Sequence, residues 1–208
     1  AASDGTVVDF AAQPLQVATG PASSLTLNMD GAKGALLQAS GYVTIDVFGF
    51  VQVAGSFAFE KSTTSVRLAD NPATVGVDES ASPVAVDLLT VGAAGVNIFA
   101  GLNGGKDNEL GLKLTGGEFA LALMSEKVEL NARKWTALQA GASEVSFVGV
   151  AGLTVSAELI SVNVNRAASD GTVVDFAAQP LQVATGPASS LTLNMDGAKG
   201  ALLQASGY

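Results

Sequence analysis

An internal repeat constrains this chain more than any other feature of its sequence. Residues 1–42 and residues 167–208 are identical, so the sequence repeats at an offset of 166. The 208 residues therefore comprise one complete repeat, 1–166, and the start of the next, 167–208. We expect the chain to be a window on a longer array, because the residues that follow Tyr42 would continue the pattern after Tyr208.

A weaker match divides the long repeat in two. The stretch "MDGAKGALLQAS" at 29–40 aligns with "LTGGEFALALMS" at 114–125, an offset of 85. The match predicts two diverged half-repeats, at about 8–85 and 86–173.

The apolar residues alternate with a period of two. Between Val51 and Phe59 every second residue is large or apolar, and the same alternation runs from Val145 to Leu159 before its phase changes at Ile160. A period of two indicates β-strands, and a change of phase indicates a bulge or bend. We therefore predict an all-β chain with no helix longer than two turns.

One strand-like stretch, "EFALALMSE" at 118–126, is apolar on both faces. Its bulky residues alternate with smaller ones: Phe119, Leu121 and Leu123 on one face, and Ala120, Ala122 and Met124 on the other. Strands covered on both sides have this pattern. Either ordinary sandwich strands lie under loops, or sheets stack closely where small residues let backbones approach.

Two architectures fit these features. We favour a continuous β-solenoid-like stack of short strands, because the chain is rich in Gly, Ala and Val, carries little charge and has no linker between its halves. The alternative is a string of tandem seven-stranded Greek-key β-sandwiches. The stack predicts an advance of about 35–40 Å per 166 residues, and the sandwiches predict about 75 Å.

Composition excludes several functions. Charged residues make up 14% of the chain and the net charge is −9, which argues against nucleic acid as a partner. The chain contains no Cys and no His, so disulfides, thiolate chemistry and imidazole catalysis are not available to it. No apolar run reaches the roughly 18 residues of a membrane helix, so we expect no membrane span in this segment.

Carboxylates are the remaining candidates for catalysis. Three acidic pairs are close in sequence: Asp78 with Glu79, Asp107 with Glu109, and Glu126 with Glu129. All lie in or beside predicted turns, where acids are ordinarily solvated surface residues. A Ser-His-Asp triad is impossible without His. We therefore predict that the chain is not an enzyme.

Two acidic loops are the calcium candidates of this sequence. The stretch "GLNGGKDNELG" at 101–111 is similar to the Gly-Gly-x-Gly-x-Asp repeats that bind calcium, but Lys106 replaces the third Gly and the motif does not recur. The six candidate ligands are Asp107, Asn108 and Glu109 in this loop, and Asp70, Asp78 and Glu79 in the loop at 70–80. Calcium takes six to eight oxygen ligands, and neither loop supplies a full set. We expect solvated loops and no cofactor.

The single tryptophan, Trp135, could stack against a sugar ring or fill the core. Its large area contributes most when buried, which favours the core. We expect the neighbouring Arg133 and Lys134 to keep that loop soluble.

Several stretches of strand sequence carry a family resemblance. They are "GSFAFEKS" (55–62), "VDLLTVGAAGVNIFAGLNGG" (86–105), "FALALMS" (119–125), "KWTALQA" (134–140) and "FVGVAGLTVSAELISVNVNRAASDGTVVDFA" (147–177). Together they resemble the long tandem repeats of giant bacterial surface and adhesin-like proteins. The resemblance implies a secreted or cell-surface location and a structural role in a fibre, stalk or sheath, without functional residues to carry over.

Partners follow from the same resemblance. We expect neighbouring repeats of the same protein to be the partners, in a homo-oligomer or filament. The alternative function is an adhesin module that binds glycan or calcium.

Overall fold

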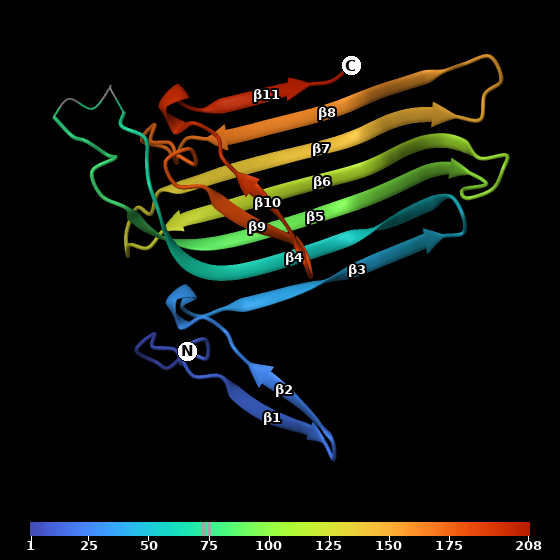
Figure 1. The fold of residues 1–208 in the computed structure, drawn as a ribbon. Coiled ribbons are helices and arrows are strands. Elements are labelled where there is room, and N and C mark those ends of the chain that lie inside the picture. Colours follow the sequence, from blue (N-terminus) through green and yellow to red (C-terminus); the bar gives the residue numbers. More distant parts are fainter. Residues whose placement is uncertain (72–73, 75) are drawn as a thin grey trace.

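The computed structural model describes residues 1–71, 74 and 76–208, and a single antiparallel sheet of seven strands dominates it (Figure 1). The spatial order of the strands is β11-β8-β7-β6-β5-β4-β3, so consecutive long strands pair as hairpins. The strands of this sheet are β3 (Leu37–Val47), β4 (Val51–Val66), β5 (Val84–Leu102), β6 (Leu110–Glu126), β7 (Lys134–Val148), β8 (Val155–Arg166) and β11 (Leu202–Ser206).

The duplicated sequence folds the same way twice. Each copy forms a short hairpin followed by a single 3-10 turn, and every element of one copy lies 166 residues from its counterpart. The elements are β1 (Leu15–Gly20), β2 (Ser23–Leu27) and η1 (Gly31–Lys33) in the first copy, and β9 (Leu181–Gly186), β10 (Ser189–Leu193) and η2 (Gly197–Lys199) in the second. Figure 1 shows β9 and β10 lying across one face of the large sheet, whereas β1 and β2 lie beyond its β3 edge.

The all-β prediction is confirmed: the described residues contain strands and two 3-10 turns, and no α-helix. The strands, however, are long rather than short, reaching 19 residues in β5 and 17 in β6. Gly95 and Gly116 have φ values of 60° and 62° inside these strands. The pairing of β5 with β6 shifts register between Ala93 and Ile98, so these glycines belong to bulged regions and not to turns.

The sequential order of the strands is that of a meander and differs from a Greek key, in which one strand returns beside the first. The predicted change of phase at Ile160 has a local cause. Leu159 adopts a φ of 49°, which is uncommon for a residue other than Gly and is typical of a bulge.

The core lies between the second copy of the duplicated sequence and one face of the sheet. We call this the small-residue face, because Ala120, Ala122 and Ala137 are completely buried at its centre. The remaining core side chains are Val66, Leu68, Val86, Leu88, Met124 and Trp135 from the sheet side, and Ala168, Val174, Phe176, Val183, Leu193 and Met195 from the second copy.

The opposite face of the sheet carries rows of large side chains across its middle and has no covering layer in the described residues. We call it the bulky face; one row across it consists of Phe59, Val91, Leu121, Leu138 and Val164, which are paired strand to strand. None of these five side chains is buried. Both faces of this strand are apolar, but among the described residues only the small-residue face is covered, so the expectation of a strand covered on both sides is wrong.

In the part of the chain that the structure describes, no helix has the length and apolar character needed to cross a bilayer.

Candidate docking interface

The hairpin of the second copy packs closely onto the small-residue face because a glycine lies beneath it. A Cβ atom at Gly92 would lie 2.2 Å from the carbonyl oxygen of Ala184 in β9, far inside van der Waals contact. Gly92 shares its cross-strand row with Ala58 and Ala120. The absence of large side chains along this row lets one backbone approach another.

A short antiparallel bridge joins the second copy to the loop after β4. Leu68 pairs with Val174, and two backbone bonds flank the pair: the Ala69 amide donates to the Val173 carbonyl at 2.9 Å and the Asp175 amide to the Arg67 carbonyl at 2.8 Å. Both side chains of the bridge are 1% exposed. Segments more than 100 residues apart are thus joined as in a sheet.

Side chains of the sheet also bond to the backbone of the second copy. The buried side-chain amide of Asn165 donates from Nδ2 to the Val174 carbonyl at 2.8 Å, and the Ser56 hydroxyl donates to the Thr185 carbonyl at 3.0 Å. In the other direction, Gln179 Nε2 donates to the Ser65 carbonyl at 2.8 Å. These bonds fix the position of the hairpin along and across the sheet.

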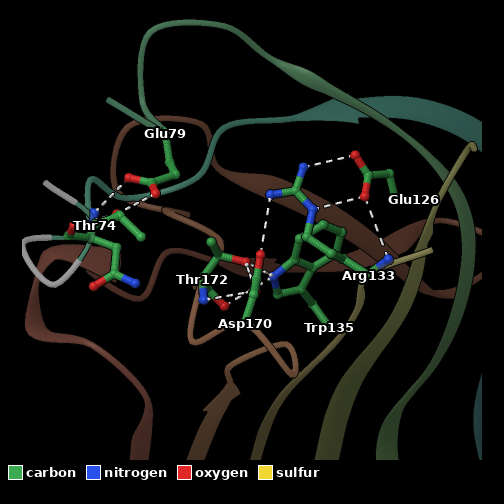
Figure 2. Close-up of polar contacts among 8 residues, drawn as sticks. Thr74, Glu79, Glu126, Arg133, Trp135, Asp170 and Thr172 are labelled. Carbon is green, nitrogen blue, oxygen red and sulfur yellow. Dashed lines mark hydrogen bonds and ion pairs between the residues drawn. The ribbon is translucent and has the colours of Figure 1, made fainter. Parts of the chain in front are cut away.

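A polar cluster at one end of the interface clamps the loop that enters the second copy (Figure 2). Arg133 forms a two-pronged ion pair with Glu126, with both N···O distances 2.7 Å, and its Nη1 lies 3.6 Å from Asp170 Oδ2. The guanidinium lies 5.3 Å from the ring centre of Trp135, a cation–π distance. Trp135 Nε1 donates to the Thr172 carbonyl at 3.1 Å, so Trp135 and Arg133 both hold the loop that contains Asp170 and Thr172.

The charges of this cluster shift the ionisation of its members. The hydrogen bonds from Arg133, and then its positive charge, lower the pKa of Glu126, although partial burial opposes the change. The pKa of Arg133 rises for the reciprocal reason. Burial alone would raise the pKa of Asp170, but hydrogen bonds from Thr172 and the charge of Arg133 lower it overall. All three groups are thus held in their charged forms.

The first copy presents the same side chains without a sheet beneath them. Val8 is 66% exposed where its counterpart Val174 is 1% exposed, and Val17 is 41% exposed where Val183 is 0% exposed. Met29 is likewise exposed, whereas Met195 is buried. Since the two sequences are identical, the difference arises entirely from what each copy contacts.

Each copy nevertheless has the same internal geometry. In the first copy Asp9 Oδ1 accepts hydrogen bonds from the amides of Ala11, Ala12 and Gly31, and Asp175 Oδ1 accepts the three equivalent bonds in the second copy. The bond from Gly31, followed by that from Ala12, lowers the pKa of Asp9. The carboxylate therefore joins the loop before the hairpin to the 3-10 turn after it in both copies, docked or not.

The calcium candidates lie at opposite ends of the sheet. Asp107, Asn108 and Glu109 are in the turn between β5 and β6, whereas Asp70, Asp78 and Glu79 are in the connection between β4 and β5. That connection also contains residues 72, 73 and 75 of the stretch at 70–80, which lie outside the described residues. The described residues hold no cluster of three or more acidic side chains able to bind a metal ion.

Several of these acids have other partners. Glu109 pairs with Lys113 at 2.8 Å, which lowers the pKa of Glu109. Glu79 accepts hydrogen bonds from the Thr74 hydroxyl and the Asn71 amide, and the bond from Thr74 contributes most to the lowering of the Glu79 pKa (Figure 2). These carboxylates hold their own loops together.

The residues around the tryptophan give one confirmation and one correction. Trp135 is 2% exposed and belongs to the core, as its area suggests. Arg133 is not a solubilising loop residue, because its guanidinium is engaged by Glu126 and stacked on Trp135. In the sequence Glu126 stands out only as one of a pair of acids near a turn, and nothing there indicates its ion pair with Arg133.

The docking interface itself was missed by the sequence analysis. The available signal was the row of Ala and Gly residues on one face of adjacent strands, which indicates close approach but does not identify the segment that approaches.

No protein-family model, curated protein or solved structure matches the chain. Its function is therefore argued from its own residues.

Proposed function

We propose that this chain is a structural repeat of a long extracellular surface protein, in which successive repeats continue one β-sheet to build a fibre, stalk or sheath. One observation carries the proposal: β11 repeats the first four residues of β3, and the two strands occupy opposite edges of the same sheet. Leu203–Ser206 of β11 repeats Leu37–Ser40 of β3.

The pairing of the two edge strands is compatible with continuation. Ala39 in β3 pairs with Phe59 of β4, while its counterpart Ala205 in β11 pairs with Val162 of β8. A strand with this sequence therefore has a partner on either side, β8 of one repeat and β4 of the next. The backbone of Tyr208 extends the pairing, since its N–H and C=O both bond to Glu158 at 2.9 Å.

The outer edge of β3 also supports continuation. Soluble proteins usually protect an exposed edge strand with charges, proline or a bulge. In β3, which is 11 residues long, Asp46 is the only charged residue, and Leu37, Tyr42 and Ile45 are exposed. An edge of this kind is suited to pairing with another strand.

The bulky face is a second surface that fits an assembled protein. Phe57 and Leu123 are 37% and 38% exposed, one on each side of the apolar row that runs from Phe59 to Val164. Extended apolar patches of this kind typically mark contacts with other protein. The partners we propose are further repeats of the same protein.

We place this protein at the cell surface. This location is supported by the resemblance to bacterial surface repeats and by the acidic composition without Cys, which suits a protein exported unfolded. Immunogold labelling of intact source cells with antibody raised against this chain tests it. We expect gold particles in lines or on filaments outside the envelope, and label confined to the cell interior would contradict the proposal.

A further inference from the structure

We propose that residues 1–36 are a docking segment whose partner is the small-residue face of another copy of this repeat. The inference deepens the structural function proposed above by naming the contact that joins one repeat to the next. It rests on a segment seen in two states within one chain: docked at residues 167–202 and undocked at residues 1–36.

The docked state identifies the occupant. The second copy covers the small-residue face through Val174, Phe176 and Val183, all of which are at most 1% exposed. The first copy has the same side chains on the same backbone framework, so any surface that matches the second copy matches the first equally well. The small-residue face of another repeat is such a surface.

The undocked state shows why a partner is needed. A two-stranded hairpin alone is marginally stable in water. Here β1 and β2 expose Leu15, Val17 and Leu25 at 49%, 41% and 59%. Covering these residues would bury apolar area that the isolated hairpin leaves in water.

The hydrogen bonds that the second copy makes would be repeated by the first. Val8 would pair with Leu68 of the other molecule as Val174 does within the chain, and Thr6 would accept from Trp135 of that molecule as Thr172 does. The Thr6 hydroxyl already donates to Asp4, as the Thr172 hydroxyl donates to Asp170. The loop that would bind Arg133 of the other molecule through Asp4 therefore has its docked conformation in advance.

Within one 208-residue chain the second copy has the advantage, because a tethered segment acts at high effective concentration. Disabling the second copy should therefore open the small-residue face to the first copy of another molecule. The identical sequences provide a matched control: Phe176→Asp with Val183→Asp disables the second copy, and Phe10→Asp with Val17→Asp disables the first.

Sedimentation and light scattering of the full chain then distinguish the outcomes. We expect the variant with the second copy disabled to form head-to-tail species with masses that are multiples of 20.7 kDa. The variant with the first copy disabled should have the same mass in solution as the unaltered chain. The variant with both copies disabled should lose the multiples. If the second-copy variant forms no multiples, or forms them equally well with both copies disabled, the proposal is overturned.

A covalent test is made in the chain whose second copy is disabled by Phe176→Asp and Val183→Asp, because the intact second copy buries Leu68 and would keep Val8 of another molecule away from it. The intramolecular control pair is made in the chain without the aspartate substitutions. Because the chain has no Cys, Leu68→Cys with Val8→Cys introduces a thiol pair that docking between molecules would bring together as a cross-strand pair. Leu68→Cys with Val174→Cys is the matched intramolecular pair and should give a monomeric disulfide. Val8→Cys with the exposed Val128→Cys reports random oxidation.

On oxidation at high protein concentration we expect a ladder of multimers from the Val8 and Leu68 pair, at least several-fold stronger than from the Val8 and Val128 pair. Equal ladders, or monomer alone from the Val8 and Leu68 pair, would overturn the docking proposal. Surface location and a structural role would still stand in that case, since immunogold labelling tests them independently of how the repeats join.

Discussion

At the scale of single residues, the interface between the second copy and the sheet depends on two kinds of position: small residues that let backbones approach, and charged residues that hold a loop. Gly92 leaves room for the β9 backbone, and Arg133 holds Glu126 and Asp170 beside Trp135. The sequence indicates the first kind of position, because a row of Ala and Gly in strands predicts close packing. It does not indicate the second, since Arg133 and Asp170 are 37 residues apart and become neighbours only through the fold.

Replacing Gly92 tests the close approach. The added methyl group of Gly92→Ala would meet the Ala184 carbonyl, and overpacking of this kind costs about 1–3 kcal/mol. We expect a lower free energy of unfolding in denaturant titrations. Gly41→Ala is the control, because its nearest neighbour is the Phe57 ring at 3.3 Å, which can turn aside. Equal stability of the two variants would show that the hairpin does not lie against Gly92.

The ion pair of Glu126 predicts a dependence on pH. In the folded chain the pKa of Glu126 lies below the ordinary value of 4.5. The ionised carboxylate therefore stabilises the fold above pH 4.5, and this stabilisation is lost as the pH falls through the pKa of the folded state. We expect Glu126→Gln to lower the free energy of unfolding by about 1–2 kcal/mol at pH 7. The difference from the unaltered chain should vanish in acid.

Glu109→Gln is the matched control for this prediction. Glu109 also pairs with a cation and also has a lowered pKa, but the side chain of Lys113 is 44% exposed, against 24% for Arg133. We expect a loss of no more than about 0.5 kcal/mol. If the Glu126→Gln variant were as stable as the unaltered chain at pH 7, the polar cluster would not stabilise the interface.

At the scale of elements, the sequence predicts strands well and their lengths poorly. Period-two alternation finds the first half of β4, but the alternating stretch at 145–159 spans the end of β7, the turn after it and the start of β8. Turns are present after Gly20, between β1 and β2, and at Asn103, between β5 and β6. The expectation of short strands was wrong, because the long strands continue through bulged regions such as the one that contains Gly95. The docked hairpin could not be predicted, because its sequence is the same in a docked and an undocked copy.

Hydrogen exchange can detect these two states in one experiment. Proteolytic peptides from residues 15–27 and 181–193 have identical sequences, so they have the same mass and the same intrinsic exchange rates. We expect their shared mass envelope to split into two equal populations at intermediate times, a protected one from β9 and β10 and a rapidly exchanging one from β1 and β2. A single envelope at micromolar concentration would contradict the difference in docking.

At the scale of the whole molecule, the sheet and its two copies of one sequence form a unit that can be repeated without a linker. In the proposed continuous sheet the strands from β3 to β8 would form one period, because β11 repeats the start of β3 at the opposite edge. Six strands at a spacing of about 4.8 Å give an advance of about 29 Å per repeat. The stack of coils expected from the sequence gave about 35–40 Å, because it counted more and shorter strands.

The length gained per repeat is the most direct test of a sheet that continues from repeat to repeat. Chains containing two, four and six 166-residue units, each completed by residues 167–208, can be measured by small-angle X-ray scattering and electron microscopy. A continuous sheet predicts that the maximum dimension grows by about 29 Å for each added unit, with a constant cross-section. Growth near 75 Å per unit, with narrow joints between globular beads, would show that the repeats fold as separate domains and would contradict the continuous sheet.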